Sequence, residues 1–219
     1  MRKSESLRFT YRAQLQYSDL SRLGDAYTFN SYNRLFLGNS SLKPAYFNNF
    51  TLNYFNFNMF NFTNIFVWLN YRKQFDTFKT VNRISGINRE SSPFNSPKSE
   101  ERINLTGRLQ KRFNNVKTSF TFRANKNTSY NIVNDDLRRF DYFTQFGSAT
   151  VATNFKAAPN VELGYSYNIN RSKDEDSVLH YITERPFVAV DVAFLKGFIF
   201  LAEYSFFDYR RGSASLNKY

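Results

Sequence analysis

Apolar and polar residues alternate one by one along most of this chain, in stretches of about ten residues. In residues 7–17, every odd position holds Leu, Phe, Tyr or Ala, and every even position holds Arg, Thr or Gln. Residues 161–170 repeat the pattern, with Val, Leu, Tyr and Ile set against Glu, Gly, Ser and Asn. Because successive side chains of a β-strand point to opposite faces, each stretch predicts a strand with one apolar and one polar face.

The length of these stretches separates two ways of crossing a membrane. The longest uninterrupted apolar run, 65–69, is far shorter than the roughly 20 residues that a membrane-spanning helix needs. A tilted transmembrane β-strand needs only about 9 to 11 residues, which the alternating stretches supply. The chain contains no Cys, which excludes disulfides and thiolate metal sites and is compatible with an oxidising compartment.

These patterns predict nine strands in a single meander, joined alternately by short and long connections. The predicted strands are 6–17, 48–57, 62–75, 99–111, 116–126, 139–155, 161–171, 178–194 and 198–210. The short connections are 58–61, 112–115, 156–160 and 195–197, and the long ones are 18–47, 76–98, 126–138 and 172–177. Outer-membrane barrels have short periplasmic turns and longer outer loops. The sequence therefore favours an all-β fold, an antiparallel up-and-down transmembrane β-barrel, in which strand 6–17 runs outward.

A soluble antiparallel sheet with one buried face explains the same alternation strand by strand. The aromatic content favours the membrane, because outer-membrane barrels place aromatic residues in girdles at the two lipid interfaces. The chain has 26 Phe and 15 Tyr. Those near predicted strand ends are Tyr11, Tyr17, Phe60, Phe62, Phe140, Tyr142, Phe206 and Tyr209.

Strand 48–57 has an irregular pattern. Phe50, Leu52 and Tyr54 occupy one phase of the alternation, whereas Phe55 and Phe57 occupy the other. Either a β-bulge or burial of both faces explains this change of phase.

The connection between the first two predicted strands contains a short motif, Leu-Gly-Asn-Ser-Ser-Leu-Lys-Pro-Ala-Tyr, at residues 37–46. It resembles the Gly-Asn-Pro-x-Leu-Lys-Pro-Glu segment that opens a downward strand in the barrel of TonB-dependent outer-membrane receptors. Ser40 stands where that family has proline, and Ala45 where it has an acid. A Leu-Lys-Pro tripeptide also suits any loop that leads into a strand. The matching residues are Gly38, Asn39, Leu42, Lys43 and Pro44.

The resemblance implies a barrel of about 22 strands around an N-terminal plug, coupled through TonB to the inner-membrane proton gradient. No plug or TonB box is visible in this sequence, and residues 210–219 read as an outer loop. An odd number of antiparallel strands also leaves a seam open in lipid. We therefore expect residues 1–219 to form a partial barrel domain that lacks the plug and the closing strands. A complete barrel of eight or ten strands is the alternative.

Residues suited to catalysis or metal binding are few. The chain has one His, His180, near the expected outer end of strand 178–194. No grouping of Ser, His and an acid can be identified, so we expect that the protein is not an enzyme and has no cofactor. Acidic residues gather in two predicted outer loops, at 135–136 and 174–176, where carboxylates can hold calcium. The Asp-x-Asp-x-Asp spacing of a calcium loop is missing, so these residues are better interpreted as solvated surface charge, and no metal is expected. The formal net charge of +12 comes without any nucleic-acid-binding motif, and no nucleic acid partner is expected.

The basic residues of the strands favour a positively charged lumen. If the apolar phase faces lipid, a set of basic side chains points inward, and we hypothesise that it guides an anionic solute. Pairing with acids on a plug or on adjacent strands is the alternative, because buried charge must be paired. The lumen-facing set is Arg8, Arg12, Arg102, Arg108, Lys117 and Arg123.

Ligand selectivity is expected in the long outer loops, because loops tolerate change while lipid constrains the barrel. The aromatic and basic candidates for ligand binding are Tyr27, Phe29, Tyr32, Arg34, Arg83, Arg89, Phe94 and Tyr130. The leading interpretation is a segment of a TonB-dependent receptor in the outer membrane of a Gram-negative type of cell. Its partners would be membrane lipid, the plug, TonB, and a small or oligomeric nutrient such as an iron chelate, a glycan or a peptide. The alternatives are a small passive pore or structural barrel, and a soluble β-sheet binding protein.

Overall fold

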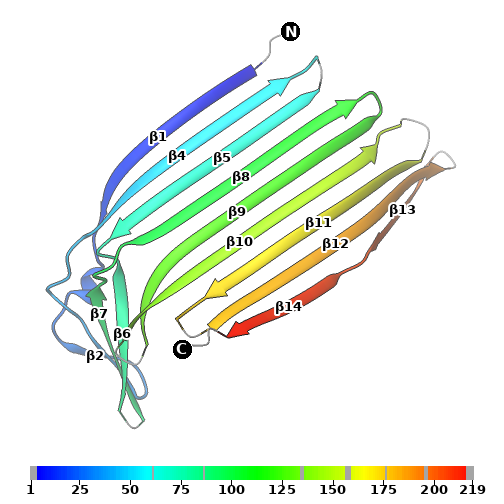
Figure 1. The fold of residues 1–219 in the computed structure, drawn as a ribbon. Coiled ribbons are helices and arrows are strands. Elements are labelled where there is room, and N and C mark those ends of the chain that lie inside the picture. The colour runs from blue at the N-terminus through cyan, green and yellow to red at the C-terminus, as the bar shows by residue number, and fades with distance from the viewer. Residues whose placement is uncertain are drawn as a thin grey trace.

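The computed structural model describes residues 4–60, 62–85, 87–133, 136–155, 159–175, 177–194 and 197–215. Its main feature is one large antiparallel sheet whose strands follow one another in chain order, with β13 and β14 both paired to β12 (Figure 1). The strands of this sheet are β1 (Ser4–Gln16), β4 (Ala45–Asn58), β5 (Thr63–Phe75), β8 (Glu100–Phe113), β9 (Val116–Val133), β10 (Asp136–Thr153), β11 (Asn160–Lys173), β12 (Ser177–Phe194), β13 (Phe198–Ser205) and β14 (Asp208–Ser215). The predicted all-β meander is confirmed.

The last predicted strand is present as two pieces that share one register. Phe187 of β12 lies opposite Ser205 of β13, and Glu184 of β12 lies opposite Asp208 of β14, so the pairing continues without a shift across 206–207. Pro186 lies at this break, and proline has no N–H to donate to the ladder. Its carbonyl still accepts a hydrogen bond from the Phe206 N–H at 3.1 Å. In the described part of the chain, β13 and β14 therefore act as one interrupted strand, the ninth of the meander.

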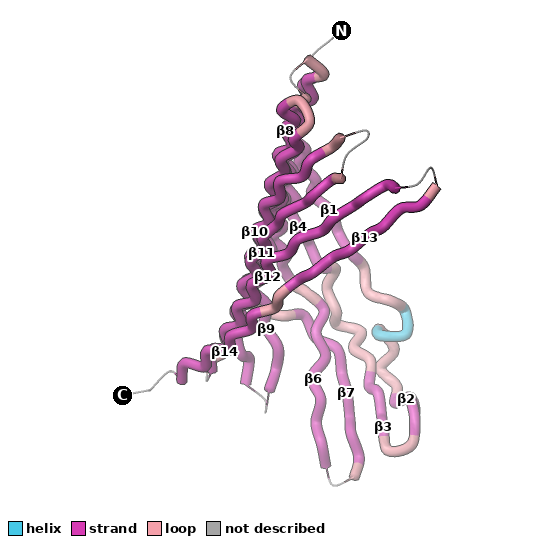
Figure 2. Tube along the Cα trace, turned by 90° about the vertical axis from the view of Figure 1, so that its right-hand side faces the viewer, coloured by secondary structure: helices cyan, strands magenta, loops and turns pink. Residues whose placement is uncertain are grey.

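The two longest connections are not unstructured. The first contains a 3₁₀ turn, η1 (Leu20–Arg22), and strands β2 (Tyr27–Ser31) and β3 (Arg34–Leu37), and the second forms a hairpin of β6 (Phe78–Ser85) and β7 (Asn88–Asn95). Together they make a second sheet in the order β2-β3-β7-β6, with β3 and β7 parallel. This small sheet projects from one end of the large sheet (Figure 2). We call this the loop end, and the opposite end, with the connections β4–β5, β8–β9, β10–β11 and β12–β13, the turn end.

Two of the predicted long loops are wrong. Residues 126–138 continue the ladder as a hairpin, in which Thr128 lies opposite Asp141 and Val133 opposite Asp136. At 172–177, β11 continues to Lys173 and β12 begins at Ser177, and Asp174 Oδ1 accepts the Ser177 N–H at 2.6 Å. Thr, Tyr and Ile in 128–132 have strong β-propensity, which sustains pairing where the apolar alternation has ended.

The register gives the large sheet two chemically distinct faces. On the apolar face, Phe9 lies beside Leu52, Leu52 beside Leu69, and Leu69 beside Leu105. The polar face carries the intervening positions. Pairing of β4 with both neighbours is continuous, so the bulge considered for strand 48–57 is absent. Phe55 and Phe57 instead lie on the polar face, each about one third exposed (37% and 36%).

No second layer covers the apolar face of the described residues. Leu7 and Phe9 are 69% and 65% exposed, and Leu163 on β11 is 57% exposed. Ala45 and Val178 are the buried hydrophobic residues of the described chain. β1 pairs with β4 alone among the described strands, and neither β13 nor β14 reaches it, so a closed barrel is not found. None of the described segments is a helix long and apolar enough to span a membrane.

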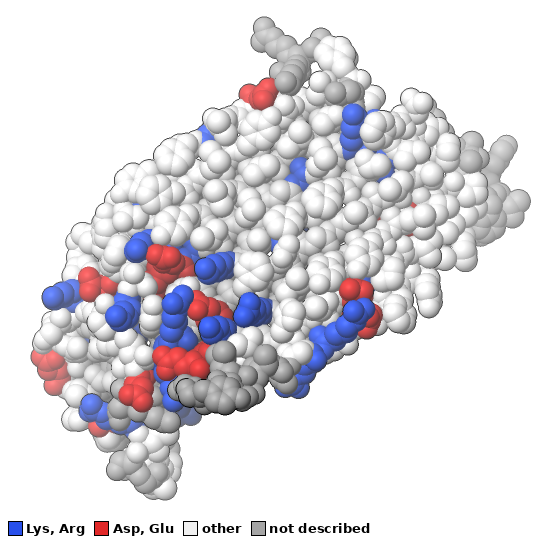
Figure 3. Space-filling view, in the orientation of Figure 1, with Lys and Arg blue, Asp and Glu red and all other residues white. Residues whose placement is uncertain are grey.

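Charged side chains concentrate toward the loop end of the molecule, whereas much of the visible face in Figure 3 carries few of them. On the apolar face, charged side chains of β5, β8 and β10 and Thr128 of β9 form one row. Lys73 Nζ lies 3.1 Å from Glu101 Oε1, and Thr128 Oγ1 donates to Asp141 Oδ1 at 2.6 Å. Along β8 the next charge on this face is Lys111, ten residues beyond Glu101. The positions between them on this face are Ile103, Leu105, Gly107 and Leu109.

Candidate ligand-binding surface

The motif at 37–46 anchors the first long connection to the second. The Gly38 backbone lies so close to Gly24 that a Cβ at position 38 would be 2.1 Å from the Gly24 carbonyl oxygen. The Asn39 N–H donates to the Arg22 carbonyl at 2.7 Å, and Asn39 Nδ2 donates to the Pro93 carbonyl at 3.1 Å. A glycine is therefore required at position 38 by backbone contact, and Asn39 links η1 to β7.

Asn95 completes this junction from the other side. Its Oδ1 accepts the Lys43 N–H at 2.8 Å, and its Nδ2 donates to the carbonyls of Lys43 at 2.8 Å and Asp76 at 2.7 Å. Next to it, Ser96 is 1% exposed, and Pro93 is fully buried. We use the name junction for Gly38, Asn39, Pro93, Asn95 and Ser96. Sequence reasoning found the motif half of the junction and missed Asn95, for which the local sequence gives no signal.

One charged group reinforces the first connection. Asp25 Oδ1 accepts the Ser40 N–H at 2.9 Å. Hydrogen bonds from the Ser40 side chain and from its backbone N–H hold the pKa of the Asp25 carboxyl below its ordinary value. The Asp25 carboxylate therefore favours the folded conformation of this connection while it remains ionised.

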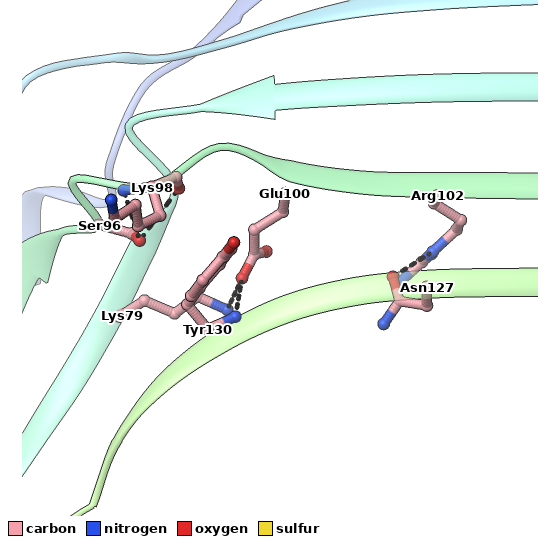
Figure 4. Close-up of polar contacts among 7 residues, drawn as sticks. All are labelled: Lys79, Ser96, Lys98, Glu100, Arg102, Asn127 and Tyr130. Carbon is pink, nitrogen blue, oxygen red and sulfur yellow. Dashed lines mark hydrogen bonds and ion pairs between the residues drawn. The ribbon is translucent and has the colours of Figure 1, made fainter. Parts of the chain in front are cut away.

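A second set of contacts joins the small sheet to the rim of the large one (Figure 4). Lys79 Nζ on β6 lies 2.7 Å from Glu100 Oε1 at the start of β8, and the same carboxylate oxygen accepts the Tyr130 N–H of β9 at 2.9 Å. Both side chains of the ion pair are mostly shielded, at 19% and 16% exposure. Glu100 thus fixes β6 relative to β8 and β9, a role that the sequence did not indicate.

Of the eight residues expected to bind ligand, six lie in the small sheet: Tyr27, Phe29, Arg34, Arg83, Arg89 and Phe94. Tyr32 lies in the turn between β2 and β3 and is 89% exposed. Tyr130 lies apart from them on β9, where its backbone contacts Glu100. The structure brings Arg34 and Arg89 directly opposite each other across the parallel pair β3 and β7.

The six basic residues expected to share a face do lie on the polar face of the large sheet: Arg8, Arg12, Arg102, Arg108, Lys117 and Arg123. Among the described residues, none of the six forms an ion pair with a carboxylate. Arg102 Nε donates to Asn127 Oδ1 at 3.3 Å (Figure 4). The Arg123 guanidinium carbon lies 5.5 Å from the ring centroid of Phe146. Acids on adjacent described strands therefore do not neutralise this set.

Arg72 belongs to the same face and was missed. It lies directly opposite Arg102, and through Asn49 it aligns with Arg12, which makes a row of three arginines near the loop end. Its guanidinium carbon is 3.9 Å from the ring centroid of Phe47. Counting every second residue forward from Asn64 within strand 62–75 would have assigned Arg72 to the polar face.

The polar face also contains a hollow of about 520 Å³. It extends from Trp68 on β5, past Arg123 on β9, to Asn168 on β11. A hollow that crosses this many strands indicates that the sheet curves toward its polar side.

The remaining sequence candidates are the acidic residues at 135–136 and 174–176 and His180. In the described part of the chain, no group of three or more His, Cys, Asp or Glu side chains is arranged to hold a metal ion. Asp174 caps the turn to Ser177, and Asp136 begins β10, whereas Asp135 and Asp176 lie outside the described residues. His180 lies opposite Arg171 near the start of β12.

Comparison with known proteins adds no assignment: no protein-family model, curated protein or solved structure matches this chain.

Proposed function

We propose that this chain is part of the barrel of a TonB-dependent type of outer-membrane receptor, which takes up a nutrient with energy from the inner membrane. The observation that carries the proposal is the apolar face of the large sheet. It lacks a covering layer in the described structure and is uncharged along the middle of β8, between Glu101 and Lys111. An apolar surface of this size requires either hydrocarbon or a protein partner.

The dimensions of the uncharged span match a membrane. Ten residues at about 3.4 Å each extend roughly 34 Å along a strand. A strand tilted by about 45° crosses roughly 24 Å of depth over that length, close to the apolar band of about 25 Å in outer-membrane barrels. The charged row at the loop end and Lys111 at the turn end would then lie at the two lipid interfaces.

Other features of the molecule agree with this orientation. Connections at the turn end are short, and an exposed aromatic residue stands in or beside each of them: Phe60, Phe113, Phe155 and Phe198. The opposite end carries the small sheet, as expected for the outer side of a receptor. One cluster departs from the pattern, since Glu184, Asp208 and Arg210 lie on the apolar face. The Arg210 Nη2 atom is 2.7 Å from Asp208 Oδ2 and 3.3 Å from Glu184 Oε2, so one guanidinium contacts both carboxylates.

Two adjacent positions on β9 test the lipid contact. The chain contains no Cys, so Phe120→Cys and Thr121→Cys each create a single labelling site, on the apolar and the polar face respectively. In native membranes, we expect a bimane at position 120 to be quenched by nitroxide-labelled lipid and a bimane at position 121 by iodide in water. Stronger quenching by iodide than by lipid at position 120 would refute a membrane location.

The reading frame that contains this chain tests the receptor part of the proposal. We expect it to encode a plug and a TonB box upstream of the present sequence. A signal peptide directly before Leu7 would instead support a small passive barrel.

A further inference from the structure

The small sheet has two faces of different charge. Its pairing register places Arg34 beside Arg89, Ser91 beside Asn82, and Ser31 beside Arg34. Thr80 joins the same side, opposite Pro93. We call this side the arginine face. It lines an open hollow of about 430 Å³, whose wall consists of Ser31, Arg34, Thr80, Asn82, Arg89 and Ser91.

The carboxylate nearest in sequence to these arginines lies on the other face. Glu90 follows Arg89 directly, so its side chain points to the opposite side of β7. There it lies opposite Arg83 and accepts a hydrogen bond from Tyr27 Oη at 3.4 Å. The hollow therefore contains two arginines and four neutral hydrogen-bonding side chains, without an acid in its wall.

Neither arginine of the hollow has an ion-pair partner among the described residues. Arg89 Nε donates to Asn82 Oδ1 at 3.1 Å, which orients that guanidinium while its terminal nitrogens stay available. Two like charges placed side by side repel each other, and a bound anion removes this repulsion.

We propose that this hollow binds an oxyanion group, a phosphate, sulfate or carboxylate, of an anionic solute that reaches the loop end. The guanidinium fork matches the geometry of such groups, and the hydroxyl and amide side chains of the wall supply further donors. The proposal names the substrate class for the receptor proposed above, and it rests on that function for its biological meaning.

Titration calorimetry on the detergent-solubilised protein tests the site. Each anionic probe has a neutral or closely related reference: inositol hexakisphosphate against inositol, sucrose octasulfate against sucrose, and oligogalacturonate against its methyl ester. We expect at least one anion to bind and its neutral reference to show no heat of binding. The anion that binds identifies whether the oxyanion is phosphate, sulfate or carboxylate.

Substitutions then locate the binding. Arg34→Gln should weaken the affinity by about tenfold or more, since a charge-assisted bidentate contact is lost. Arg34→Lys keeps the charge without the fork and should restore only part of the affinity. Arg83→Gln is the matched control on the opposite face and should bind like the unmodified protein. Arg34 makes no hydrogen bond through its side chain in the described structure, so its replacement should leave the proteolysis pattern of the small sheet unchanged.

Two results would overturn the inference: no anion binds more tightly than its neutral reference, or Arg83→Gln weakens binding as much as Arg34→Gln. The labels on β9 keep the two proposals separable. Anion binding that depends on Arg34, together with iodide-accessible bimane at position 120, would retain this site and reject the outer-membrane receptor.

Discussion

The apolar face of the large sheet and the junction under the small sheet are held in place in different ways. On the large sheet, backbone pairing between adjacent strands holds the strands together, but side chains such as Leu7 and Phe9 remain mostly exposed. At the junction, Pro93 and Ser96 are buried, and the Asn95 amide satisfies backbone groups of two other segments. The contacts of the junction come from within the chain, whereas the apolar face of the large sheet has no covering layer among the described residues.

This difference determines which property of a substituted side chain matters in each region. On the apolar face there is space around each residue, so polarity should decide the effect of a substitution. At the junction the backbone segments are in contact, so shape should decide it. The following predictions test this contrast.

The largest effect is expected at the centre of the apolar face. Leu105 lies between Leu69 and Ala124 there, four residues from Glu101. If this face contacts lipid, Leu105→Arg places a charge close to the middle of the bilayer and should lower the free energy of unfolding by about 2–4 kcal/mol. Urea unfolding of protein purified from membranes and reconstituted in lipid vesicles measures this change.

Thr106→Arg is the matched control, since it adds the same side chain one position away on the polar face. Its effect should be smaller, because the polar face tolerates a charged side chain and the added cost is repulsion from Arg123 directly opposite, about 0.2–1 kcal/mol. Equal destabilisation by the two substitutions would mean that the two faces share one environment, and it would break the contrast between them.

A smaller, purely steric effect is expected at Gly38. In Gly38→Ala the new methyl group would lie 2.1 Å from the Gly24 carbonyl oxygen, so the backbone must shift. We expect docking of the first connection to weaken by about 1–3 kcal/mol. Limited proteolysis in native membranes should then cleave near Phe29 faster, while the large sheet stays intact.

Gly24→Ala provides the control for the loss of a glycine. A Cβ at position 24 would meet nothing within 4 Å, although this residue is the partner of Gly38 in the close contact. Cleavage rates should therefore stay at the unmodified level. If Gly24→Ala were cleaved as fast as Gly38→Ala, the loss of a glycine, rather than the close backbone contact at position 38, would explain the faster cleavage.

Much of the large sheet is predictable from the sequence, because the alternation of apolar and polar residues is a local pattern that identifies a strand by itself. Leu7, Phe9 and Tyr11 identify a strand without reference to any other segment. The predicted end of strand 116–126 was wrong because residues 125–129 are polar in both phases, whereas β9 continues to Val133 through backbone pairing with β10. For Phe55 and Phe57 the sequence left a bulge and burial of both faces open, and the continuous register of β4 excludes the bulge.

The small sheet and the junction were not predictable, because they depend on contacts between distant segments. Arg34 and Arg89 become neighbours only through the parallel pairing of β3 with β7. Asn95 contacts Lys43, more than fifty residues away, and no local pattern marks an asparagine for that role. The motif around Gly38 did single out the right segment, but its role in joining the two connections required the structure.

The smallest predicted effect concerns the charge of Asp25. Its folded-state pKa is lowered by the hydrogen bonds from Ser40, so its stabilising contribution is fully present above the unfolded pKa, near 3.9, and is lost as the pH falls through the folded pKa. Pepsin cleaves at exposed Leu and Phe in acid, and Leu20 and Phe29 flank this aspartate. The Asp25→Asn variant has no ionisable group at this position. Dividing the cleavage rate of the unmodified protein by that of Asp25→Asn therefore cancels the pH dependence of pepsin itself. This ratio should be below one at pH 4.5 and should approach one as the pH falls toward 2. A ratio that stays constant across this range would show that Asp25 does not stabilise the first connection, and the junction would then depend on shape alone.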